Sequence, residues 1–236
     1  MHSWRKEEFQ VIVLVSANAE WETVLRFYKD PTVQKSPFGT YFYTSIAGKS
    51  TILFHGGWGK ISAAASAQYA IDHWNPGLLI NIGTCGGLAG KTHVGELLLV
   101  EQTLVYDIYE RMGDPAAAIS HYSTQLDLSF LNEPFPQNVR KVRLVSADQD
   151  IDPDLVYKLM DDYSAIAADW ESGAIAWTAQ QNQIRCLILR GVSDLVDPLG
   201  GEIYESGEFH DRAQEIMYPI LKALPNWIRC ALWGIK

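Results

Sequence analysis

The sequence is poor in cysteine, which excludes two classes of protein. Its three cysteines, Cys85, Cys186 and Cys230, are spread over 236 residues. They are too few and too widely spaced for a disulfide framework or a cysteine-rich metal cluster. We therefore expect a reduced, cytoplasmic protein with no metal site and no cofactor.

The sequence also lacks net positive charge and long apolar runs. Its 19 Lys and Arg stand against 28 Asp and Glu, a net charge of −9. This balance argues against nucleic acid or an anionic membrane as the main partner. No apolar run is long enough to cross a bilayer. The run 11–15 is too short for the core of a signal peptide, so we predict a first strand there.

The composition and length of the chain are typical of a globular domain. Hydrophobic residues make up 47% of the chain and charged residues 20%. This composition is ordinary for a folded protein, and the length permits a substantial core. We predict a single α/β domain over residues 1–236.

One stretch, from Leu78 to Leu88, organises the rest of the chain. It follows a Pro-Gly break and begins with an apolar run, as expected of a strand that is buried on both faces of a parallel sheet. It ends in glycines around Thr84. Glycine lets the backbone approach a ligand closely. The stretch predicts a central strand followed by a ligand-binding turn; an ordinary strand exit is the alternative.

Predicted strands alternate with predicted helices along the chain. This alternation indicates an α/β fold with a mostly parallel, mixed central sheet flanked by helices. Residues 107–136 show no clear period and form a long excursion. The expected strands are 10–17, 39–47, 50–55, the apolar part of 78–88, 95–100, 141–146, 165–168 and 186–190. The expected helices are the segment that follows 18–22 and ends at 27, and residues 61–74, 153–163, 174–183, 208–224 and 227–233.

Polar side chains follow several of these strands. They include Glu20, Thr84, Asp148, Glu171 and Asp194. Ligands bind outside the carboxyl ends of parallel strands, so these groups are expected to line one cleft. Each has a plainer explanation as a helix cap. That explanation fits Asp194 least, because an acid after a buried strand is costly unless it is paired.

Four motifs resemble those of the nucleoside phosphorylase/nucleosidase family, and the resemblance extends from Val11 to about Leu224. They occur in the family's order: a Gly-x-Gly-Lys helix start, a central Gly-(Ser/Thr)-x-Gly-Gly turn, an acidic signature before a helix, and a late Ser-Asp pair. Here they read Gly57-Trp58-Gly59-Lys60, Gly83-Thr84-Cys85-Gly86-Gly87, Asp169-Trp170-Glu171-Ser172 and Val192-Ser193-Asp194.

The resemblance implies cleavage of a nucleoside's N-glycosidic bond. Asp194 is then the general acid that protonates the leaving base, and Ser193 orients it. Glu171 accepts hydrogen bonds from the ribose hydroxyls and faces the developing positive charge. The remaining residues implied to bind the substrate are Thr84, Cys85, Gly86, Ile151 and Trp170.

Asn81 favours water over phosphate as the nucleophile. The family's phosphorylases carry an Arg at this place, and a neutral amide holds phosphate poorly. The resemblance therefore favours a methylthioadenosine/S-adenosylhomocysteine nucleosidase, an enzyme of purine metabolism and methionine salvage. Such an enzyme needs a base for the water. In the family's nucleosidases this base is a Glu in the turn after the first strand. Counted from Ala17, that position is Trp21. A one-residue adjustment of the turn places Glu20 there, and we choose Glu20 over Glu22.

Two alternatives stay open. A phosphorylase would need a cation, from Lys60, Arg26 or Arg190. A nucleoside-binding protein without catalysis is suggested by Trp21 and by Asp150, which stands where the nucleosidases usually have an aromatic residue.

We also predict a homo-oligomer. Trp227, Trp233 and apolar residues of the excursion are expected to need cover from a second chain.

Overall fold

The computed structural model describes residues 10–203 and 208–232. Its strands are β1 (Val11–Val15), β2 (Gln34–Ser36), β3 (Gly39–Ile46), β4 (Lys49–His55), β5 (Leu78–Leu88), β6 (Leu97–Val105), β7 (Thr124–Gln125), β8 (Arg140–Ser146), β9 (Ala167–Asp169), β10 (Cys186–Asp197) and β11 (Gly200–Gly201). Its helices are α1 (Asn18–Phe27), α2 (Lys60–Trp74), α3 (Pro115–His121), α4 (Val156–Tyr163), α5 (Ser172–Gln181) and α6 (Phe209–Leu232), with a 3-10 turn at Pro153–Leu155.

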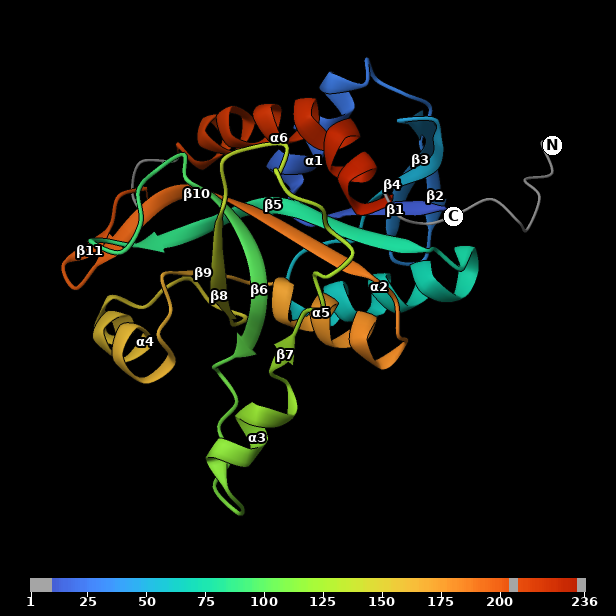
Figure 1. Cartoon of the computed structure of the whole chain (residues 1–236). Helices are drawn as coiled ribbons and strands as arrows, with labels where there is room; N and C mark the ends of the chain where they lie inside the picture. The colour runs from blue at the N-terminus through green and yellow to red at the C-terminus, as the bar shows by residue number, and fades with distance from the viewer. Residues whose placement is uncertain (1–9, 204–207, 233–236) are drawn as a thin grey trace.

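Strand β5 is the centre of the sheet. It pairs in parallel with β1 and β10 and antiparallel with β9. Because β10 also pairs with β6, the strands β5, β10, β6, β8 and β9 form a closed ring. The hairpin β3–β4 extends the sheet on the other side of β1 (Figure 1). The predicted α/β architecture with a mixed sheet is confirmed, and its long central pairings are parallel.

Helices cover both faces of the sheet. Helices α1 and α6 pack together on one face, and α2 and α5 on the other (Figure 1). Side chains alternate along a strand. In β1, Val13 therefore packs in the cluster that holds Trp21 of α1 and Met217 of α6, while Leu14 packs in the cluster that holds Ala67 of α2. This two-sided burial explains why β1 is apolar throughout.

Two predicted strand exits are wrong. The glycine-rich segment after Ile82 does not turn; it continues as the second half of β5, paired with β10. Strand β10 likewise runs on past Arg190 to Asp197, with an irregular register between Val192 and Asp194. The pairing of these two extensions with each other keeps both in strand conformation.

The two helices predicted near the C-terminus are one helix, α6. It contains Pro219 and Pro225. Proline removes one backbone donor from a helix and usually bends or ends it. Here the residues on both sides of Pro225, such as Leu221 and Trp227, are buried against the same sheet face, which keeps the two halves in one helix.

The excursion has structure of its own, and one residue expected to need cover from a second chain, Trp227, does not need it. It contains α3 and the short strand β7, and α3 extends away from the sheet (Figure 1). Trp227 is completely buried within its own chain, so it needs no cover from another. Trp233 lies outside the described residues. No helix in the described ranges is both long and apolar enough to cross a membrane.

Candidate active site

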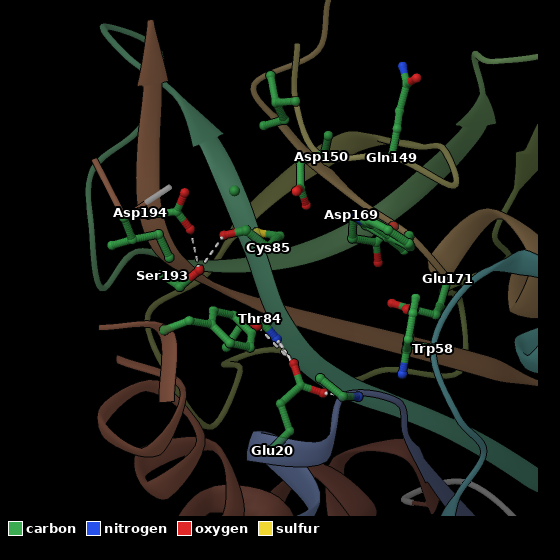
Figure 2. A pocket seen from close by; sticks show the side chains of 17 residues that line it. Glu20, Trp58, Thr84, Cys85, Gln149, Asp150, Asp169, Glu171, Ser193 and Asp194 are labelled. Carbon is green, nitrogen blue, oxygen red and sulfur yellow. Dashed lines mark hydrogen bonds between the residues drawn. The ribbon is translucent and has the colours of Figure 1, made fainter. Parts of the chain in front are cut away.

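A cavity of about 540 Å³ lies over the second halves of β5 and β10 (Figure 2). Asp148, which was expected at this cleft, does not line it, but the other nine residues predicted for the site do. They come from α1, β5, the segment after β8, the segment between β9 and α5, and β10, and are Glu20, Thr84, Cys85, Gly86, Ile151, Trp170, Glu171, Ser193 and Asp194. The cavity brings together segments that are far apart in the sequence.

Glu20, rather than Trp21 or Glu22, reaches the cavity. Its Oε1 accepts hydrogen bonds from the Thr84 amide at 2.6 Å and the Thr84 hydroxyl at 2.8 Å, and its Oε2 accepts one from the Ala17 amide at 3.1 Å. Trp21 instead stacks on His55 in the core. The carboxylate can lie this close to β5 because Gly83 has no side chain: a Cβ there would be 2.9 Å from Glu20 Oε1.

Glu171 is held at the start of α5. The Gly59 amide donates a hydrogen bond to its Oε1 at 3.0 Å. Gly59 has a φ of 85°, a conformation that glycine adopts without strain. Burial, followed by the negative charge of Asp169, raises the pKa of Glu171 to about 8. Near neutral pH this pKa favours the protonated carboxyl, with a fraction ionised.

Asp194 sits at the irregularity in β10, and Ser193 lies beside it. The Ser193 hydroxyl is 2.6 Å from Asp194 Oδ1 and 3.2 Å from the Cys85 carbonyl oxygen (Figure 2). A hydroxyl carries one proton, so the shorter contact assigns it to Oδ1, and no described residue donates a hydrogen bond to Oδ2. Burial raises the pKa of Asp194. A raised pKa favours the protonated carboxyl, which is the form that can donate a proton.

A buried ion pair lies behind the cavity lining, and of its two residues only Asp169 belongs to that lining. Arg190 Nε is 2.7 Å from Asp169 Oδ2, and Arg190 Nη2 donates to Asn81 Oδ1 at 2.5 Å. Ser146 and Ser172 also donate to Asp169. Sequence reasoning did not assign Asp169 to the site, although it stands in the motif that contains Glu171. It also missed Ala17, Gln149, Ala168, Ile203 and Phe209, which carry no recognisable signal.

The cavity lining is acidic. It contains the carboxylates of Glu20, Asp150, Asp169, Glu171 and Asp194. No Lys, Arg or His stands among the described lining residues. A bound anion would therefore find no cationic partner among these lining side chains. No group of three or more His, Cys, Asp or Glu in the described ranges is arranged to hold a metal ion.

The cations proposed for a phosphate site are engaged elsewhere. Lys60 pairs with Asp107 and lies 3.6 Å from Asp148 Oδ2. Arg26 pairs with Glu22 on the surface at 3.6 Å. Arg190 is buried in the ion pair described above.

The fold and this site define an α/β enzyme of the phosphorylase superfamily. The model of that superfamily matches residues 10–224, and the chain belongs to it. Among individual proteins, the chain is 26% identical over 198 residues to 5′-methylthioadenosine/S-adenosylhomocysteine nucleosidase of Staphylococcus haemolyticus, covering 78% of this chain and 86% of that one.

Solved structures show the same fold at lower identity. The Helicobacter pylori 5′-methylthioadenosine/S-adenosylhomocysteine nucleosidase superposes with a TM-score of 0.78 at 16% identity, over 93% of this chain and 97% of that one. The futalosine hydrolase of the same species superposes with a TM-score of 0.79 at 16% identity, over 94% and 99%.

Proposed function

We propose that this protein hydrolyses the N-glycosidic bond of a purine nucleoside of the methylthioadenosine/S-adenosylhomocysteine type. One observation carries the proposal: Glu20, Glu171 and Asp194 line a single cavity that has no cationic side chain among its described residues. Relatives at 26% identity are named for this activity. The roles of the three acids follow from their surroundings.

Asp194 acts as the general acid. Its Oδ2 donates a proton to N7 of the purine while the bond from the sugar to the base breaks, so the bonding electrons leave with a neutral base. Ser193 holds the other oxygen, Oδ1, and so fixes the direction of Oδ2. Burial, which raises the Asp194 pKa, keeps the proton available. Proton transfer of this kind contributes about 10²–10⁴-fold to the rate.

Glu171 holds the sugar. Its Oε1 is fixed by Gly59, and its Oε2 is left to accept a hydrogen bond from a ribose hydroxyl. The transition state places positive charge on the sugar, and an ionised Glu171 stabilises that charge. The rims of the sugar and base sites are then formed by Thr84, Cys85, Gly86, Ile151 and Trp170, which line the same cavity.

Glu20 activates water. Two hydrogen bonds from Thr84 occupy both lone pairs of Oε1, whereas Oε2 accepts only the Ala17 amide among the described residues. Oε2 therefore retains a lone pair that can take a proton from water. The water oxygen forms the new bond to the sugar carbon that the base has left.

The positions of the cations favour water over phosphate. Lys60, Arg26 and Arg190 are each paired with a carboxylate, and none lines the cavity. An inorganic phosphate bound beside Glu20 and Glu171 would find no cationic side chain among the described lining residues. The phosphorylase alternative would require one of these pairs to break.

The decisive experiment is a base-release assay across a nucleoside panel, with and without inorganic phosphate. We expect release of base from methylthioadenosine and S-adenosylhomocysteine at a rate that phosphate does not change. A strict requirement for phosphate would identify a phosphorylase. Tight nucleoside binding without base release at any phosphate concentration would identify a binding protein.

A further inference from the structure

The segment after β8 places the carboxylate of Asp150 in the cavity lining. A Cβ on Gly86 would be 2.9 Å from Ile151 Cδ1 and 3.8 Å from Asp194 Oδ2. The segment therefore lies on β5 directly beside Asp194. Figure 2 shows Asp150 between Asp194 and Asp169, across the cavity from Glu20.

Asp150 is available to a ligand. It is exposed, it lines the cavity, and its side chain has no hydrogen-bond partner within residues 10–203 and 208–232. Its charge acts on the acid itself, because Asp150 contributes to the raised pKa of Asp194. A carboxylate cannot stack on a base, but when ionised it accepts hydrogen bonds and cannot donate them.

The purine edge that meets Asp194 carries two groups. In adenine they are the N7 acceptor and the 6-amino donor; in a 6-oxopurine they are two acceptors, N7 and O6. Asp194 serves N7 with Oδ2, and its Oδ1 already accepts from Ser193. Oδ1 keeps one lone pair, and a 6-amino group has two N–H donors, so a second acceptor beside Asp194 has a proton to accept.

We propose that Asp150 is a specificity-determining residue that accepts a hydrogen bond from an amino group of the base and so selects 6-aminopurines over 6-oxopurines. This inference rests on the proposed function for its placement of the base. An amino group gains a charge-assisted hydrogen bond from Asp150. An oxo group in the same place faces a carboxylate that offers no proton, and its acceptor is left unpaired.

The test compares adenosine with inosine, and adenine with hypoxanthine, in the wild type and in Asp150→Asn. Asparagine is nearly the same size but both donates and accepts, so it can serve either base. We expect the adenosine-to-inosine ratio of kcat/KM to fall about 10-fold or more, and the ratio of the dissociation constant of adenine to that of hypoxanthine to rise by a similar factor. Asp154→Asn, an exposed acid outside the cavity lining, is the matched control and should change neither ratio.

The outcomes separate this inference from the proposed function. If nucleosides are hydrolysed but both ratios are the same in Asp150→Asn as in the wild type, Asp150 is not the selector and the nucleosidase assignment stands. A wild-type preference for inosine and hypoxanthine also overturns the inference. If no nucleoside releases its base, the proposed function fails, and the dissociation constants of adenine and hypoxanthine alone decide the role of Asp150.

Discussion

At the scale of single residues, the chemistry proposed for the cavity depends on which acidic side chains line it and on whether they hold a proton. Asp194 was visible in the sequence, because an acid after a buried apolar strand has few structural explanations. The choice between Glu20 and Trp21 was not visible. It depends on how α1 begins after β1, and the structure resolves it by placing Trp21 against His55 and Glu20 against Thr84. Asp169 was missed because its partner, Arg190, is 21 residues away in the chain.

Asp194→Asn should abolish most turnover while leaving nucleoside binding largely intact. Asparagine keeps the shape and can still accept from Ser193, but it has no acidic proton for the leaving base. We expect kcat to fall about 10²–10⁴-fold with a much smaller change in the dissociation constant. Steady-state kinetics and equilibrium binding test this, and base release at the wild-type rate would remove Asp194 from the mechanism.

Glu171→Gln should change how stability depends on pH. Burial and Asp169 raise the pKa of Glu171 from 4.5 to about 8. Between these values the folded protein retains a proton that the unfolded chain releases, so this group's contribution to stability is complete below 4.5 and is lost as pH rises towards 8. Glutamine does not titrate and can still accept from Gly59.

Thermal unfolding from pH 5 to pH 8 measures this effect. The melting temperature of Glu171→Gln minus that of the wild type should become more positive as pH increases. The exposed Glu22→Gln is the control and should follow the wild-type profile. A constant difference between Glu171→Gln and the wild type across this range would show that the Glu171 carboxyl is not buried in the protonated form.

At the scale of elements, β5 and β10 show where local sequence signals fail. The glycines after Ile82 predict a turn, yet the chain continues as a strand, because Gly86 pairs with Asp194 and the two extensions support each other. No local pattern contains that pairing. The same holds for α6, in which Pro225 predicts a break but burial on both sides preserves one helix.

Gly191→Ala should destabilise the protein through the contact between β10 and α6. A Cβ at Gly191 would lie 2.1 Å from Ile216 Cγ2, far inside van der Waals contact. Overpacking of this kind typically costs about 1–3 kcal/mol in the free energy of unfolding. Gly113→Ala is the control, because its nearest neighbour would be 3.7 Å away, and it should stay within about 0.5 kcal/mol of the wild type. Equal stability of both variants in urea would contradict the close packing of α6.

At the scale of the whole molecule, alternation of strands and helices was enough to predict the α/β class. It was not enough to predict the ring of β5, β10, β6, β8 and β9. The ring closes through pairings between strands distant in the sequence, and these depend on the lengths of β5 and β10 beyond their predicted ends. The meeting of Glu20, Glu171 and Asp194 follows from that closure.

The prediction of a homo-oligomer now depends on the excursion rather than on Trp227. Tyr109 is 77% exposed and Met112 is 98% exposed. Large apolar side chains exposed together favour burial against another surface. Sedimentation equilibrium should give a mass that is a multiple of the chain's 26.5 kDa, and replacing both residues by serine should shift it towards one chain. A monomer at all concentrations would contradict the prediction.

The most direct measurement identifies the sugar formed from methylthioadenosine in saturating phosphate. If Glu20 activates water in a cavity with no cationic side chain in its described lining, mass spectrometry will detect free adenine and the free sugar in equal amounts. Formation of the sugar 1-phosphate, or no release of adenine at all, would contradict hydrolysis by these three acids.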